Sequence, residues 1–240
     1  MQYLRWLRKR RKVPDFTGGM RHLQFDITHL CNRYCPLCDH RIKYSDYTYL
    51  TKEDYERIVG CIEDRGDILE VHLGGGEPLC HPHFDWLVAR IREDFTNARV
   101  MLSTNGRLLP KLGEETFALL DGVTISHYQG WNDEVVAAYG EREGVRVLPR
   151  PTGCFWDPYR DPDLDEKTAK RVRARCYHDI RIVGTRLYGC RIAEPAERYY
   201  KTEPVHVEFG PNWKEDWRNL PTWKACQHCF RSIDWPWLKE

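Results

Sequence analysis

The sequence predicts an α/β fold in which strands and helices alternate. Between residues 22 and 149, runs typical of strands are separated by amphipathic stretches typical of helices. Parallel strands need such crossover helices, so we expect the strands to pair in parallel. From about residue 150 the pattern gives way to proline, glycine, aromatic residues and cysteines. We therefore expect a βα region over residues 21–155 and a small cysteine-rich region over residues 156–240.

The expected elements follow one another along the chain. The strands lie within residues 22–31, 68–78, 98–106, 122–128 and 144–149, and the helices within residues 51–66, 81–94, 113–122, 132–139 and 164–175. Thr51 can cap the first helix and Gly66 can end it. Residues 176–190 read as a short hairpin that turns at Gly184–Thr185 and has a cysteine at each end.

Composition and charge indicate which classes of protein this chain can belong to. The 240 residues carry a net charge of +1, which gives no argument for nucleic acid binding. Apolar runs long enough to span a membrane or to form a signal peptide core are missing, so we expect a cytoplasmic protein. Ten cysteines without a secretion signal indicate metal or thiol chemistry. Residues 1–20 form a basic arm, either solvated or able to touch an anionic partner.

Three cysteines, Cys31, Cys35 and Cys38, fall in the loop after the first expected strand. Three thiolates on a four-iron cluster leave one iron with an open site, where a small molecule can bind and react. A zinc site is the alternative, and it would need a fourth ligand such as His29 or His40.

The chain resembles the radical S-adenosylmethionine (radical SAM) superfamily. The CxxxCxxC spacing after the first strand is joined by "GGGEP" at residues 74–78, "STNG" at residues 103–106 and Ser126, each at the end of a strand. The resemblance implies a partial (β/α)6 TIM-like barrel, a [4Fe–4S] cluster open for S-adenosylmethionine, and a 5′-deoxyadenosyl radical that abstracts hydrogen from substrate. His127–Tyr128 departs from the family pattern, since many relatives carry an aspartate–glycine pair there.

Residue roles are carried over from this resemblance. Cys31, Cys35 and Cys38 are expected to hold the catalytic cluster. The expected contacts to S-adenosylmethionine are Gly75, Gly76, Glu77, Ser103, Asn105 and Ser126. Glycine lets backbone approach closely, and a carboxylate such as that of Glu77 can accept hydrogen bonds from an ammonium group.

A second set of cysteines follows the βα region: Cys176, Cys190, Cys226 and Cys229. Their spacing alone allows a zinc site. After a radical SAM core, however, the set resembles the twitch domain, an abbreviated relative of the SPASM domain. That resemblance implies a second, fully cysteine-ligated [4Fe–4S] cluster in residues 156–240.

A saturated second cluster can still accept an electron, which suits the two-electron oxidation of a small alcohol or sugar-like substrate. Twitch-type radical SAM alcohol dehydrogenases are similar in layout.

One alternative is a radical SAM peptide maturase that crosslinks, epimerises or decarboxylates its substrate, and another is a non-catalytic zinc-binding interaction module. The expected partners are a small-molecule or peptide substrate and a reductant such as flavodoxin or ferredoxin. Arg150 and Cys154 are candidate substrate contacts.

Overall fold

The computed structural model describes most of the chain between residues 21 and 227. The described residues are 21–35, 38, 40, 42, 45–150, 164–175, 180–190, 193–201, 203–221, 224 and 226–227. The basic arm at residues 1–20 and the predicted site residues Cys154, Cys176 and Cys229 lie outside them. Of the helices in the described ranges, none combines the length and the apolar character needed to cross a membrane.

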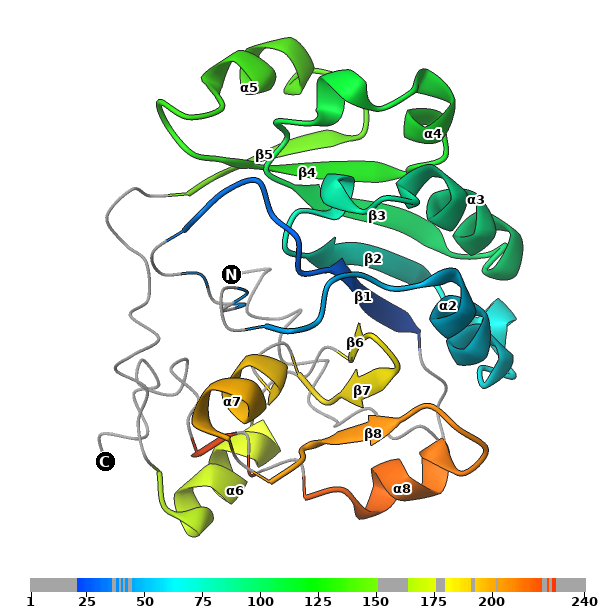
Figure 1. The fold of residues 1–240 in the computed structure, drawn as a ribbon, viewed down its shortest axis with the longest axis vertical. Coiled ribbons are helices and arrows are strands. Elements are labelled where there is room, and N and C mark those ends of the chain that lie inside the picture. The colour runs from blue at the N-terminus through cyan, green and yellow to red at the C-terminus, as the bar shows by residue number, and fades with distance from the viewer. Residues whose placement is uncertain are drawn as a thin grey trace.

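One eight-stranded sheet runs through the molecule in the order β5-β4-β3-β2-β1-β6-β7-β8 (Figure 1). Its strands are β1 (His22–Thr28), β2 (Glu70–Gly75), β3 (Arg99–Thr104), β4 (Gly122–His127), β5 (Val145–Pro149), β6 (Arg181–Val183), β7 (Arg186–Tyr188) and β8 (His206–Glu208). The six strands from β5 to β6 pair in parallel, whereas β7 pairs antiparallel with both of its neighbours, β6 and β8. This confirms the predicted α/β fold as a partial barrel: the sheet of the described residues stays open between β5 and β8.

Helices connect the strands from β1 to β5 in turn, as predicted, and three more of the described helices follow β5. The helices are α2 (Lys52–Gly60), α3 (Phe84–Asp94), α4 (Glu114–Ala118), α5 (Asp133–Tyr139), α6 (Glu166–Arg175), α7 (Ala193–Tyr200) and α8 (Trp213–Asn219). Short 3-10 turns are η3 (Arg65–Asp67), η4 (Pro78–Cys80) and η5 (Leu109–Lys111). In Figure 1, α2, α3 and α4 lie along the outer side of the sheet.

The first helix shows how well its limits could be predicted. The Thr51 hydroxyl accepts a hydrogen bond from the backbone N–H of Asp54 at 3.1 Å, which confirms the predicted cap. The predicted end at Gly66 is wrong, because α2 ends at Gly60. The N–H groups after it bond to carbonyls three residues back, which tightens the last turn, and η3 then forms separately.

The two faces of the sheet differ in polarity. Alternate strand residues form the core under the helices: Leu23, Phe25, Ile27, Val71, Leu73, Val100, Leu102, Val123 and Ile125. The residues between them face the other side, since successive strand side chains alternate. On that side Gln24 pairs in register with His72, and Ser103 pairs with Thr124. The sheet therefore presents a polar inner face.

The predicted hairpin is present, and it also pairs with a strand of the βα region, which was not expected. Its strands β6 and β7 turn at Gly184–Thr185, as the sequence indicates. In addition, β6 pairs in parallel with β1, so the hairpin continues the sheet of the βα region. Trp213 and Trp217 of α8 are buried in the same core. Sequence analysis missed this pairing, because a three-residue strand has too few positions to show a pattern.

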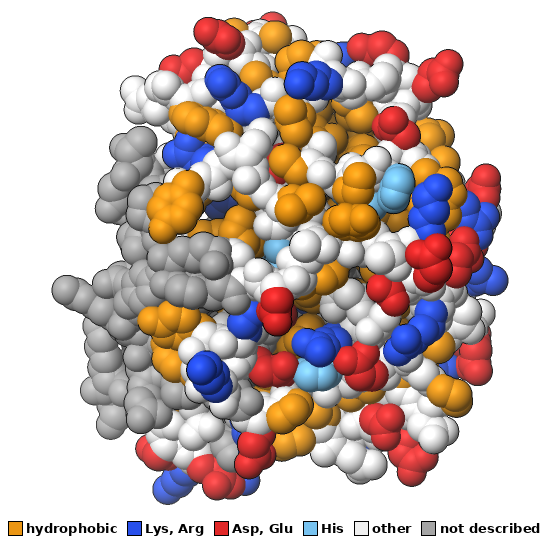
Figure 2. All heavy atoms as spheres, viewed as in Figure 1, with side chains coloured by type: hydrophobic (Ala, Val, Ile, Leu, Met, Phe, Trp, Pro, Cys, Tyr) orange, Lys and Arg blue, Asp and Glu red, His pale blue; other side chains and the backbone are white. Residues whose placement is uncertain are grey.

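Charge on the surface is mixed. On the face drawn in Figure 2, acidic and basic side chains alternate among apolar ones and form no large field of one sign. This agrees with the net charge of +1.

Candidate active site

The three cysteines of the CxxxCxxC motif lie where the chain leaves β1 at the carboxyl edge of the sheet. Cys31, Cys35 and Cys38 are all partly buried. Burial raises the pKa of Cys31 to about 12, and Glu77, Cys35 and Cys38 act on it in the same direction. The three thiols are therefore near enough to interact electrostatically. A thiol with a pKa as high as that of Cys31 needs a nearby cation, such as a metal cluster, to become a thiolate.

The glycine loop after β2 lies directly on the start of the cysteine loop. The backbone N–H of Gly76 donates to the Thr28 carbonyl at 2.6 Å, and that of Glu77 donates to the Leu30 carbonyl at 2.8 Å. Gly75 has φ +115°, and a Cβ there would come within 2.2 Å of the Thr28 oxygen. A Cβ on Gly76 would come within 2.4 Å of the Leu30 oxygen. These two glycines are thus required for the chain to approach its own backbone.

Glu77 is a buried carboxylate held by neutral donors. Its Oε1 accepts hydrogen bonds from the Thr104 hydroxyl at 2.6 Å and the Leu79 N–H at 3.2 Å, and its Oε2 accepts one from the Asn105 N–H at 2.7 Å. Burial raises the pKa of Glu77, although these hydrogen bonds oppose the shift. A ligand ammonium group would supply the positive charge that favours the ionised form.

Three asparagines connect the strand ends to the cysteine loop. The Asn105 side-chain amide donates to the Asn32 side-chain oxygen at 2.7 Å. The buried Asn132 amide donates to the carbonyls of Asn105 at 2.7 Å and Ser126 at 2.9 Å. Its oxygen accepts from the Tyr128 N–H at 2.8 Å. Asn132 was missed by sequence analysis, where its only signal was its place as the first residue of an expected helix.

The two predicted serines occupy different places. Ser126 lies at the end of β4, and its hydroxyl accepts a hydrogen bond from Arg150 Nε at 3.3 Å. Ser103 lies farther inside on β3, where its hydroxyl is 2.7 Å from His72 Nε2. Glu77, Asn105 and Ser126 are thus linked around the cysteine loop, whereas Ser103 belongs to the polar inner face.

An arginine of the cysteine loop packs against two aromatic rings. The Arg33 guanidinium carbon lies 4.1 Å from the centroid of the Tyr128 ring and 4.3 Å from that of Trp131. The two rings contact each other edge-on, with centroids 5.9 Å apart. The contact of Arg33 with Tyr128 and Trp131 joins the cysteine loop to the loop after β4. Tyr128 occupies the departure from the family pattern noted in the sequence, whereas the contact with Arg33 was not foreseen.

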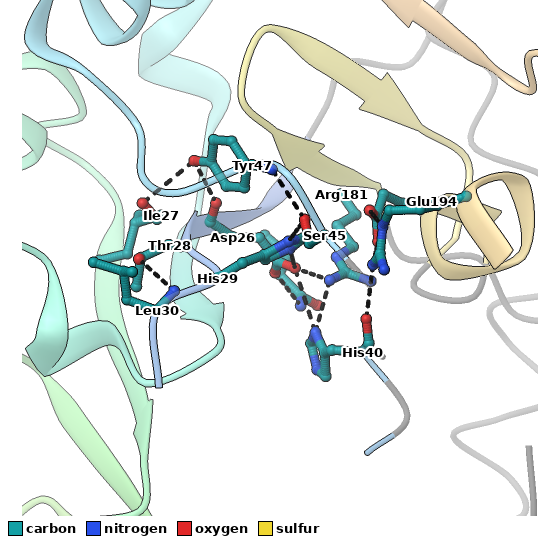
Figure 3. A network of polar contacts seen from close by, with 12 residues as sticks. Asp26, Ile27, Thr28, His29, Leu30, His40, Ser45, Tyr47, Arg181 and Glu194 are labelled. Carbon is teal, nitrogen blue, oxygen red and sulfur yellow. Dashed lines mark hydrogen bonds and ion pairs between the residues drawn. The ribbon is translucent and has the colours of Figure 1, made fainter. Parts of the chain in front are cut away.

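A buried polar network fixes the other end of the cysteine loop (Figure 3). Arg181 forms an ion pair with Asp26 and lies 2.7 Å from His40 Nδ1. The Arg198 guanidinium donates to the His40 carbonyl at 2.9 Å. Burial lowers the pKa of His29 to about 4, so its neutral ring shares a 2.6 Å hydrogen bond with Ser45. Both histidines proposed as fourth zinc ligands therefore use Nδ1 for contacts outside the cysteine set.

Comparison with known proteins decides the family. The profile of the Radical SAM superfamily matches residues 25–144, half of the chain. The chain belongs to the radical SAM superfamily. The matched segment runs from β1 to the start of β5, so it includes the cysteine loop, the glycine loop and the ends of β3 and β4.

Curated relatives of this radical SAM chain are GTP 3′,8-cyclases. The protein from Heliobacterium modesticaldum (strain ATCC 51547 / Ice1) is 34% identical over 124 residues, which cover 48% of this chain and 36% of the relative. The protein from Staphylococcus aureus (strain Mu3 / ATCC 700698) is 26% identical over 143 residues, which cover 53% of this chain and 42% of the relative. The chain thus spans about two fifths of the length of these relatives.

Solved structures of BtrN share the fold over most of this radical SAM chain. BtrN in complex with AdoMet and 2-DOIA matches with a TM-score of 0.58 and 14% identity, covering 87% of this chain and 85% of BtrN. An open conformation of BtrN matches with a TM-score of 0.55 and 14% identity, covering 90% and 89%. The likeness is one of fold, and it agrees with the layout expected from the sequence.

Membership of the radical SAM superfamily implies S-adenosylmethionine and a [4Fe–4S] cluster. The residues present are chemically suited to both: three neighbouring thiols for iron, and a buried carboxylate held by neutral donors for an ammonium group. Among the described residues, no group of three or more His, Cys, Asp or Glu side chains has the arrangement of ligands around a single metal ion. The ligands of a cluster bind different iron atoms and need no such common point.

The second cysteine set is described in part. Cys190 follows β7, and Cys226 is buried beside Gln227, whose carbonyl accepts a hydrogen bond from the Leu164 N–H at 3.0 Å. Cys176 and Cys229 lie outside the described residues, as does the candidate substrate contact Cys154. The four-cysteine cluster and the domain limits at residues 155 and 156 stay predictions.

Proposed function

We propose that this radical SAM enzyme cleaves S-adenosylmethionine reductively and oxidises an alcohol carbon of a small, sugar-like substrate. The observation that carries the first part is the contact between two loops. The cysteine loop lies against the glycine loop through the bonds of Thr28 and Leu30, and the glycine loop carries the buried Glu77 carboxylate. Metal ligands and a group suited to an ammonium ion are thereby brought to one edge of the sheet.

Each residue has a proposed task. Cys31, Cys35 and Cys38 hold a cluster that, with S-adenosylmethionine bound, supplies the 5′-deoxyadenosyl radical for hydrogen abstraction. Glu77 accepts the ammonium group of S-adenosylmethionine. Asn105 and Ser126 give polar contacts to the same cofactor at the ends of β3 and β4.

The polar inner face of the sheet supports an alcohol substrate. Gln24, His72, Ser103 and Thr124 offer hydrogen-bonding groups to substrate hydroxyls. The His72 imidazole, 2.7 Å from the Ser103 hydroxyl, is a group that can take up the proton released on oxidation. Dehydrogenation also requires an acceptor for a second electron, and we assign that need to the predicted second cysteine set. A reductant such as flavodoxin or ferredoxin would supply the first cluster.

Cyclisation of a nucleotide is the second candidate. It is favoured by the curated relatives, which are named GTP 3′,8-cyclases and are up to 34% identical across the aligned region. Because the alignments cover only 36% and 42% of two of those proteins, their activity is carried to this chain as a proposal alone.

The experiment starts from anaerobic reconstitution with iron and sulfide. We expect a brown protein with about eight iron atoms per chain if both clusters form. Dithionite and S-adenosylmethionine should then yield 5′-deoxyadenosine, and the substitution Cys38→Ala should abolish it. Iron incorporation without 5′-deoxyadenosine would contradict the first part of the proposal.

Product mass separates the two reactions. Incubation with a panel of cyclitols, sugars and GTP is followed by mass spectrometry. Dehydrogenation yields a product two hydrogen atoms lighter than its substrate, whereas intramolecular cyclisation of GTP leaves the mass of the substrate unchanged. A product of unchanged mass from GTP alone would replace dehydrogenation with the second candidate.

A further inference from the structure

Three arginine guanidinium groups gather around the loop that follows β4, beside the cysteine loop. Arg33 is stacked on Tyr128 and Trp131 as described above. The Arg107 guanidinium carbon lies 5.2 Å from the Trp131 ring centroid, and its Nη1 donates to the Trp131 carbonyl at 3.0 Å. Arg150 Nε donates to the Ser126 hydroxyl at 3.3 Å, near the end of β4.

The groups that hold these three arginines are neutral: aromatic rings, a carbonyl and a hydroxyl. Arg142 provides the contrast. It stacks on Phe117 at 4.2 Å in the same way, but its Nη2 also forms an ion pair with Glu114 at 2.7 Å. A guanidinium oriented by neutral partners keeps its positive charge and several N–H donors for an anion. Because the side chain is already ordered, less entropy is lost when the anion binds.

Two of the arginines, Arg33 and Arg150, share a neighbour with the cysteines of the predicted cluster. Burial raises the pKa of Tyr128 to about 12, and Cys35, Arg150, Arg33 and Cys38 all act on the same phenol. These groups are therefore within electrostatic range of one ring. Arg33 is itself part of the cysteine loop, two residues after Cys31 and two before Cys35.

We propose that Arg33, Arg107 and Arg150 bind an oxyanion, a phosphate or a carboxylate, carried by the substrate. This rests on the proposed function, because it takes the edge with the cysteine loop as the reaction site. It narrows the substrate class from any small, sugar-like alcohol to one that carries an anionic group. An anion held by Arg33 would keep the rest of the substrate beside the cysteines.

Matched sugars test the proposal. Glucose 6-phosphate, glucuronate and glucose are titrated by calorimetry into the reconstituted protein saturated with S-adenosylmethionine. We expect at least one anionic sugar to bind about tenfold or more tightly than glucose, since charge-assisted hydrogen bonds are the stronger ones. Comparison of the two anionic sugars tells which oxyanion is preferred.

Variants locate the binding. Arg33→Gln and Arg107→Gln should each weaken the anionic sugar about tenfold, Arg107→Lys should retain part of the affinity, and Arg142→Gln should leave it unchanged. Arg107 is exposed and outside the cysteine loop, so Arg107→Gln remains decisive if Arg33→Gln loses its iron.

Three results would overturn the proposal: equal binding of glucose and both anionic sugars, equal weakening by Arg142→Gln, or anion binding that disappears once S-adenosylmethionine is saturating. The last would assign the arginines to the carboxylate of the cofactor. Formation of 5′-deoxyadenosine is measured separately on the same samples. A failure of the radical chemistry is thereby distinguished from a failure of anion recognition.

Discussion

The guanidinium of Arg181 and the carboxylate of Asp26 form an ion pair in which both side chains are completely buried. Asp26 lies on β1, the strand that leads into the cysteine loop, and Arg181 is the first residue of β6. The same guanidinium contacts His40, which follows the last cysteine of the loop by two residues. The pair therefore anchors the cysteine loop to the part of the chain that carries the second cysteine set.

Removing one partner of this pair should destabilise the protein strongly. Arg181→Met leaves a buried carboxylate without its cation, and we expect a loss of about 3–5 kcal/mol in the free energy of unfolding. The double variant Asp26→Leu/Arg181→Met should recover much of that loss, because the Asp26 carboxylate is removed together with its cation, while the buried Glu194 keeps its ion pair with Arg198. Urea unfolding under anaerobic conditions measures both. Arg142→Gln, which removes an exposed ion pair, is the control, and an equally small effect of Arg181→Met would refute the prediction.

The contact between the glycine loop and the cysteine loop predicts that alanine at two glycine positions will have very different effects on stability. Gly75→Ala places a Cβ within 2.2 Å of the Thr28 oxygen at φ +115°, so we expect a cost above about 2 kcal/mol and less iron bound after reconstitution. Gly60→Ala places its Cβ in open space at the end of α2 and should be neutral or slightly stabilising. Thermal unfolding and iron analysis test the pair. Similar behaviour of the two variants would count against the described loop contact.

Local sequence signals predicted the parts of this fold that depend on local chemistry. The Thr51 cap, the alternation of strands and helices, and the Gly184–Thr185 turn all follow from residue types at fixed spacing. The pairing of β6 with β1 depends on which strand a three-residue segment meets in space, so no local pattern reveals it. The end of α2 at Gly60 was missed for a related reason, because the segment up to Gly66 keeps a composition compatible with helix.

Motif resemblance gave the candidate site residues, but not the contacts between them. Arg33 was visible as a basic residue inside the cysteine motif, yet its stacking on Tyr128 and Trp131 requires two loops from different strands. Asn132 bridges β3 and β4 through carbonyl groups, which carry no sequence signature. Such contacts arise from the packing of loops and cannot be read from spacing.

Binding of S-adenosylmethionine should depend on pH through Glu77. Burial raises the pKa of this carboxyl group, and only the ionised form, which predominates above that pKa, binds an ammonium group well. Affinity should therefore fall as the pH is lowered through the raised pKa, at a higher pH than for an exposed carboxylate. Calorimetric titration over a series of pH values below the pKa of the cofactor's own α-amino group, about 7.7–8.0, measures this. Glu77→Gln should bind about tenfold or more weakly and without that pH dependence. An unchanged affinity in the variant would exclude Glu77 as the partner of the ammonium group.

Asn132 should support the site without contacting the cofactor. Asn132→Ala leaves two buried carbonyls and the Tyr128 N–H without their partner, and we expect a loss of about 2–3 kcal/mol in stability. Asn132→Asp keeps the acceptor for Tyr128 but loses both donors, so it should not restore stability. Denaturation curves of the two variants, with iron content as a second readout, provide the test. Wild-type stability in Asn132→Ala would contradict the bridging role.

The central claim is that the three-cysteine set is an open cluster site for S-adenosylmethionine. Electron paramagnetic resonance of the dithionite-reduced protein, with and without the cofactor, tests it most directly. We expect the spectrum of the first cluster to change when S-adenosylmethionine is added, both in the wild type and in the double variant Cys226→Ala/Cys229→Ala, which should hold about four fewer iron atoms. In Cys38→Ala the response should disappear. Two results would contradict the account. One is a cluster spectrum that is identical with and without S-adenosylmethionine. The other is a spectral response to S-adenosylmethionine that persists in Cys38→Ala but disappears in the double variant Cys226→Ala/Cys229→Ala.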